Sequence, residues 1–107
     1  MIYDFMRVIL LFDLPMTTKK DVRTYNVFRK YLIKNGYIMM QFSVYCRIFN
    51  NRESATKHLE VLKRNVPKKG QIRVMTVTEK QYSNIAIIVG GVSKQENVVS
   101  EEPYLSL

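Results

Sequence analysis

The chain has 107 residues, which is enough for one domain with a single hydrophobic core and too few for two domains that each fold alone. Its hydrophobic content of 47% excludes a disordered or fibrous chain. Lys and Arg total 17 against 9 Asp and Glu, and the resulting net charge of +8 favours a polyanionic partner, of which nucleic acid is the commonest.

The first predicted elements are a strand and a helix. Residues 6–14 are aliphatic and β-branched and end at Pro15, which indicates a strand closed by proline. Thr18, followed three residues later by Asp21, is typical of a helix start, and Gly36 ends this helix. Its apolar residues recur at spacings of three and four, at Val22, Tyr25, Phe28 and Leu32.

Two strands and a second helix follow. Residues 37–49 are rich in aromatic and β-branched side chains, and the polar residues Gln41 and Ser43 mark a bend that divides them into two antiparallel strands. Asn50 or Asn51 caps the second helix. The apolar stripe of this helix and its closing proline are Ala55, Leu59, Leu62, Val66 and Pro67.

A last strand completes the domain. Residues 71–79 predict a strand, so the order is strand, helix, strand, strand, helix, strand. This order is typical of an α+β, ferredoxin-like fold, in which both helices cover one face of an antiparallel sheet. We assign residues 1–91 to this domain and residues 85–89 to an extra edge strand. Residues 92–107 form a polar, acidic tail with a net charge of −2, against +10 for the domain.

The first strand has apolar side chains on both of its faces. Alternation places Val8 and Leu10 on one face, and Ile9 and Leu11 on the other. Two helices cover only one face, and a face exposed to water is expected to be polar. We therefore predict a homodimer in which the helix-free faces pack together and residues 85–89 join the partner's sheet edge. The predicted interface residues are Ile9, Leu11, Ile85 and Ile87.

Asp13 ends the first strand on the face assigned to the dimer contact. A two-fold axis would bring two Asp13 carboxylates together, and like charges in a partly dry cleft need a proton, a basic side chain or a cation. Mg²⁺ is a good solution because it takes oxygen ligands, keeps several waters and can contact a phosphate. Such a site would activate water beside a phosphodiester. The alternative is that Asp13 caps the turn at Leu14 and Pro15 or pairs with a nearby basic residue.

The remaining titratable residues are less suited to catalysis. Asp21 is explained by its place in the first turn of a helix. His58 lies one residue from the core position Leu59, and we interpret it as a packing residue rather than a general base. The single cysteine, Cys46, excludes an intramolecular disulfide and is interpreted as a small apolar strand residue. Neither a leader peptide nor a membrane-spanning run is recognisable, so we expect a cytoplasmic protein.

The basic residues fall into three groups. They follow the first strand (Lys19, Lys20, Arg23), lie on the first helix (Arg29, Lys30, Lys34) and surround the second helix and its exit (Lys57, Lys63, Arg64, Lys68, Lys69). Acidic partners are too few to balance them, so phosphate contacts are favoured over an ordinary solvated helix face. The predicted nucleic-acid-binding residues are Lys19, Lys20, Arg23, Lys68 and Lys69. Because no aromatic run typical of a single-strand platform is seen, we expect recognition of backbone and shape.

Several runs resemble the small CRISPR-associated adaptation proteins of the Cas2 family. They are residues 12–15 (Phe-Asp-Leu-Pro), the helix residues Tyr25, Phe28, Arg29 and Lys30, residues 41–45 (Gln-Phe-Ser-Val-Tyr), residues 67–70 and residues 76–81. The resemblance covers roughly residues 6–90 and is closest in character to the subtype II-A members that accompany the Cas9 effector.

This resemblance implies a ferredoxin-like homodimer that bridges two dimers of the CRISPR integrase on captured double-stranded DNA. In that complex it would help to fix the length of DNA inserted into the repeat array. The resemblance also implies an Mg²⁺-dependent endonuclease acting on RNA or DNA, with Asp13 of each subunit as the metal ligand. Residues 85–89 would cross to the partner subunit, and the acidic tail would dock on the integrase.

Two other functions stay open at this point. One is a stand-alone endoribonuclease like the mRNA-cutting toxins that share this fold, and RNA cleavage abolished by Asp13→Asn would favour it. The other is a regulatory or ribosomal module without chemistry. Monomeric behaviour with Ile9 and Leu11 exposed would favour that module.

Overall fold

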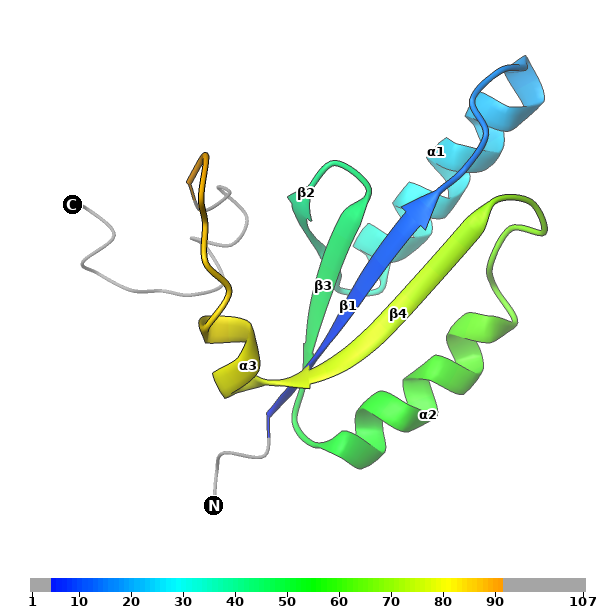
Figure 1. Cartoon of the computed structure of the whole chain (residues 1–107). Helices are drawn as coiled ribbons and strands as arrows, with labels where there is room; N and C mark the ends of the chain where they lie inside the picture. Colours follow the sequence, from blue (N-terminus) through cyan, green and yellow to red (C-terminus); the bar gives the residue numbers. More distant parts are fainter. Residues whose placement is uncertain (1–4, 92–107) are drawn as a thin grey trace.

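The computed structural model describes residues 5–91, which form a four-stranded antiparallel sheet with two long helices on one of its faces (Figure 1). The elements are β1 (Met6–Asp13), α1 (Lys19–Lys34), β2 (Ile38–Gln41), β3 (Val44–Phe49), α2 (Arg52–Lys63), β4 (Gln71–Thr78) and α3 (Glu79–Ser83). The strand order in the sheet is β2-β3-β1-β4. The element and strand orders agree with the predicted α+β, ferredoxin-like fold.

β1 lies between β3 and β4 and supplies the centre of the core. Val8 and Leu10 are fully buried against the helices, as the alternation along the strand predicted. The helices contribute to this core Tyr25, Phe28 and Leu32 from α1 and Ala55 and Leu62 from α2. Burial of each large aliphatic side chain stabilises the fold by about 1.5 to 3 kcal/mol.

The helix boundaries follow local capping signals. Thr18 and Asp21 form a reciprocal capping box at the start of α1, because each side chain accepts a hydrogen bond from the other's backbone N–H. Gly36, with φ of +88°, lies directly after the C-terminal cap of α1. Asn51 rather than Asn50 caps α2. These three boundaries are confirmed, but α2 ends at Lys63 with Arg64 as its C-terminal cap, so the predicted extension through Val66 to Pro67 is wrong.

The hairpin between β2 and β3 has an irregular turn at the predicted place. Its register shifts between Met39 and Gln41, and Ser43 has a positive φ of 64°. The backbone N–H of Phe12 donates to the carbonyl of Ser43 at 3.1 Å. This bond ties the turn to the end of β1.

The chain after β4 differs from the prediction. The strand ends at Thr78 instead of continuing to residue 79, because Thr78 and Gln81 form a capping box that starts α3. Figure 1 shows α3 on the opposite side of the sheet from α1 and α2, so this short helix covers part of the face predicted to be free of helices. The helix-free face below is the face that neither α1 nor α2 covers. Residues 85–89 form no strand within the described chain, and their pairing with a partner subunit stays a prediction. Residues 92–107 lie outside the described part.

Candidate functional site

Asp13 is exposed at the end of β1, opposite Gln71 of β4. Strand alternation places it on the same helix-free face as Leu11. Within residues 5–91 its carboxylate makes no hydrogen bond or ion pair, so neither a turn cap nor a basic side chain occupies it. The carboxylate is therefore available to a ligand.

Gly70 sets the path of the chain beside Asp13. Its φ is +89°, and a Cβ at this position would lie 2.6 Å from the backbone oxygen of Asp13 and 2.8 Å from Cδ2 of Leu14. Only glycine fits this approach without a shift of the backbone. The glycine thus allows Lys68 and Lys69 to lie close to the end of β1.

A hollow of about 320 Å³ lies between the start of α1 and the turn that follows α2. Its lining consists of Leu14, Pro15, Lys20, Asp21, Thr24, Pro67, Lys68 and Lys69. Three of the predicted nucleic-acid-binding lysines are thereby brought to one place. Lys19 and Arg23 are exposed on α1 but do not line this hollow.

The charge of this hollow is positive despite Asp21. Hydrogen bonds from Thr17 and Thr18 hold the pKa of Asp21 below its ordinary value, so that it stays ionised. Oδ2 of Asp21 already accepts hydrogen bonds from Thr17 and Thr18 at the start of α1. The three lysines outnumber this one carboxylate, and their ammonium groups suit phosphate oxygens.

The helix-free face is apolar around Ile9. Ile9 is 5% exposed and lies between Cys46 of β3 and Met75 of β4, whereas Leu11 and Met75 are 37% and 49% exposed. The residues after α3 expose further apolar side chains, namely Ile85, Ile87, Ile88 and Val89. The expected apolar character of this face is confirmed for the described residues.

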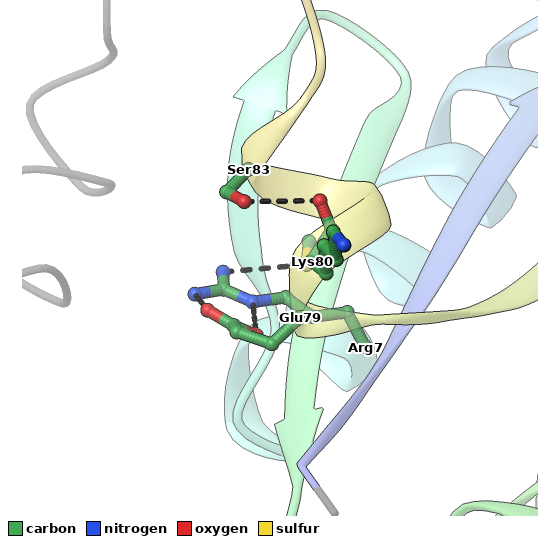
Figure 2. Close-up of polar contacts among 5 residues, drawn as sticks. Arg7, Glu79, Lys80 and Ser83 are labelled. Atoms are coloured by element: carbon green, nitrogen blue, oxygen red, sulfur yellow. Dashed lines mark hydrogen bonds and ion pairs between the residues drawn. The ribbon is translucent and has the colours of Figure 1, made fainter. Parts of the chain in front are cut away.

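Arg7 is a residue whose role the sequence analysis missed. It lies on the helix-free face with 6% of its surface exposed, and its Nε and Nη2 donate to the two carboxylate oxygens of Glu79 at 2.9 and 2.8 Å (Figure 2). The guanidinium also lies 3.7 Å from the ring centroid of Tyr82. Burial opposes its charge, but hydrogen bonds with Glu79 and Cys46 outweigh this and raise the pKa of Arg7. The pairing holds α3 against the sheet.

A signal for this pairing was present in the sequence. Arg7 is a charged residue in an otherwise apolar strand, and a buried arginine needs an acidic partner. In the sheet Arg7 lies opposite Val77, and Glu79 is two residues further along on the same side.

His58 has the packing role that was predicted. Its Nε2 lies 2.7 Å from the hydroxyl of Tyr37, and its ring lies 5.0 Å from that of Phe49. Burial, together with the charge of Arg47, lowers the pKa of His58. The histidine thus packs inside a small aromatic cluster, where burial disfavours its charged form.

One chain supplies few ligands for a metal. Residues 5–91 contain no cluster of three or more His, Cys, Asp or Glu side chains that could hold an ion. Mg²⁺ in proteins is bound by one or two carboxylates, together with waters and substrate phosphates. One Asp13 carboxylate from each of two subunits fits that donor set.

No helix within residues 5–91 has the length and apolarity to cross a membrane.

Comparison with known proteins agrees with the resemblance seen in the sequence. The family described as "CRISPR associated protein Cas2" matches residues 6–85. A protein of Acidovorax ebreus is 47% identical over 95 residues, covering 89% of this chain and 93% of that protein. A protein of Treponema denticola is 48% identical over 105 residues, covering 95% and 100%. Both relatives are named CRISPR-associated endoribonuclease Cas2.

Proposed function

The chain belongs to the Cas2 family of CRISPR-associated proteins, and we propose that it is a homodimeric subunit of CRISPR spacer acquisition that also cleaves phosphodiester bonds at Asp13. As a scaffold it bridges integrase dimers on captured double-stranded DNA. The observation that carries the proposal is the exposed carboxylate of Asp13, which has no hydrogen bond or ion pair within residues 5–91 and ends an apolar strip close to a lysine-lined hollow.

The apolar strip supports the dimer. A second copy packed on the helix-free face would remove Leu11 and Met75 from water. Both side chains are partly exposed in the single subunit, so their further burial would stabilise the dimer. Ile85 and Ile87 are about half exposed, and residues 85–89 would bury them by adding a strand to the partner's sheet. This arrangement brings the two Asp13 residues towards a common axis.

The chemistry of the site follows from its donors. Asp13 of each subunit would hold Mg²⁺, which when bound supplies charge neutralisation at the phosphate and a more acidic water. Lys20, Lys68 and Lys69 bind neighbouring phosphates and fix the path of the nucleic acid past the end of β1. The relatives named as endoribonucleases support RNA as one substrate.

Substitution of Asp13 separates cleavage from binding. We expect Asp13→Asn to abolish Mg²⁺-dependent cleavage of RNA and DNA, because the amide removes the charge that attracts the cation. The same variant should leave duplex affinity and association with the integrase nearly unchanged. Full cleavage by Asp13→Asn would refute the assigned site, and loss of integrase association would refute the division between scaffold and chemistry.

Charge reversal tests the lysine hollow. We expect Lys68→Glu combined with Lys69→Glu to weaken duplex binding in an anisotropy titration. Lys57→Glu combined with Lys63→Glu is the matched control, because it changes the net charge equally at exposed positions of α2. Equal loss in both double variants would show that only the overall field matters.

A single substitution tests the dimer. Leu11→Glu should produce monomers in sedimentation velocity, since it buries a charge in the proposed interface. Val27→Glu, on the exposed side of α1, is the control and should stay dimeric. A dimeric Leu11→Glu variant would overturn the assigned interface.

A further inference from the structure

Phe42 is an aromatic residue left in water at the turn of the β2–β3 hairpin. It exposes 73% of its surface, whereas Phe12, Phe28 and Phe49 are at most 6% exposed. Single exposed apolar side chains are common on protein surfaces, so it is the position and surroundings of Phe42 that indicate a role. The function proposed above gives Phe42 no role.

The ring of Phe42 is held in position from one side. It stacks on the ring of Tyr25, with centroids 5.9 Å apart and planes inclined by 21°. Tyr25 is itself buried and packs on Phe12, with centroids 5.6 Å apart. One face of the Phe42 ring is therefore seated on the core. The high exposure of the side chain leaves the other side open to a flat ligand.

The backbone places the hairpin turn beside the end of β1, with the Phe42 ring on the α1 side of the sheet and Asp13 on the opposite face. The hydrogen bond from Phe12 to the carbonyl of Ser43 joins the hairpin turn to the last residues of β1. In the strand order β3-β1-β4, the hairpin approaches Asp13 from the β3 side and Gly70 approaches it from the β4 side. Asp13 thus lies between an aromatic turn and a cationic turn.

The charge around Phe42 favours a polyanion over an acidic or neutral protein surface. Residues 22–52, which include α1 after its first turn and the hairpin, contain six Lys or Arg residues and no Asp or Glu. Arg29 lies one helical turn after Tyr25 on α1 and adds to this positive charge. A nucleic acid supplies both the anionic backbone and the flat π-face that this surface suits.

We propose that Phe42 stacks on an unpaired nucleobase of the bound strand. A base inside a duplex is already stacked on both faces, so the ring can bind only a base that lies in a single-stranded segment or at a frayed end. The inference rests on the proposed function and deepens it. It adds to that function a residue that would contact a base of an unpaired strand without any base-specific hydrogen bond.

Binding measurements in the Asp13→Asn background test the platform without cleavage. We expect Phe42→Ala to weaken the binding of an unstructured 20-nucleotide RNA roughly tenfold, the scale of one base–aromatic stack, and to leave a blunt duplex of equal length unaffected. Phe42→Leu keeps apolar bulk without a π-face and should lose the same affinity. Val27→Ala removes apolar surface elsewhere on an exposed position and should change neither affinity.

A spectroscopic variant gives an independent readout. Because the chain contains no tryptophan, Phe42→Trp introduces a single reporter whose emission should be quenched by the RNA and not by the blunt duplex. Equal losses for RNA and duplex in Phe42→Ala, an unquenched tryptophan, or conversion of Phe42→Ala to a monomer would each overturn the inference. The last result would instead assign Phe42 to the subunit interface.

These outcomes differ from failure of the proposed function. If Asp13→Asn still cleaves while Phe42→Ala selectively loses RNA, the cleavage site is wrong and the stacking platform stands. If Asp13→Asn is inactive and Phe42→Ala binds RNA normally, the cleavage site stands and the platform is wrong.

Discussion

Substitution of Glu79 perturbs the contact that holds α3 against the sheet, on the face opposite α1 and α2. Glu79 provides both acceptors for the Arg7 guanidinium, and the side chains of Arg7 and Glu79 are 7% and 43% exposed. Glu79→Ala would leave the arginine buried without its counter-charge. We expect a loss of about 2 kcal/mol in the free energy of unfolding, since hydrogen bonds to charged groups contribute about 1.5 to 3 kcal/mol. A fully buried pair would cost about 3 to 5 kcal/mol, but water reaches Glu79.

Urea and thermal unfolding at a fixed protein concentration measure this loss. For a domain of this size, about 2 kcal/mol corresponds to a fall in Tm of roughly 8 to 16 °C. This loss of stability should depend little on salt, because the guanidinium is buried and dissolved ions cannot approach it. Glu53→Ala removes the partner of Lys57 in an exposed ion pair of 3.8 Å and should leave the stability nearly unchanged.

The double variant Arg7→Met with Glu79→Met completes the test. It removes the buried charge together with its partner, so we expect it to recover most of the stability that Glu79→Ala loses. The reasoning fails if Glu79→Ala costs no more than Glu53→Ala, or if the double variant is less stable than either single substitution. Since α3 precedes residues 85–89, Glu79→Ala should also weaken the dimer.

Three further predictions concern the turn, the aromatic cluster and the hollow. Gly70→Ala should destabilise the fold by about 1 to 3 kcal/mol in urea unfolding, because its Cβ meets the backbone of Asp13 at a positive φ; unchanged stability would contradict the packing there. His58 has a lowered pKa in the folded state, so the unfolded chain binds more protons and stability should fall as the pH drops below about 6.5. His58→Gln should flatten this Tm profile, and an unaltered slope would exclude His58 as its source. Duplex affinity should fall with salt. The slope of log affinity against log salt concentration should be smaller by roughly two in the double variant Lys68→Glu, Lys69→Glu than in the unmodified protein. An equal slope would show that these lysines do not contact phosphates.

The proposed scaffold and cleavage roles place different demands on the same surface. Scaffolding needs only a stable dimer and phosphate contacts, which the apolar strip and the lysine hollow would supply. Cleavage additionally needs the Asp13 carboxylate to stay unpaired, and no basic side chain binds it within residues 5–91. Asp13→Asn therefore divides the two roles with little change to the fold.

Signals that act over a few residues were sufficient to predict most elements. The capping box of Thr18 and Asp21, the cap at Asn51 and the glycine at 36 each satisfy backbone groups within one turn, so the sequence predicts these boundaries. α3 is the exception. The β-branched residues before it favour a strand through residue 79, but the capping box of Thr78 and Gln81 ends the strand and starts this helix.

The sequence by itself determined the four strands and the two long helices, the core face of β1 and the excess of positive charge, because each depends on periodicity or composition. Only the tertiary structure decided which residues meet. Arg7 and Glu79 are 72 positions apart, and Lys20 shares its hollow with Lys68 because the start of α1 lies beside the turn after α2. Strand register and turn geometry fix such contacts, and both are set when the whole sheet closes around its core.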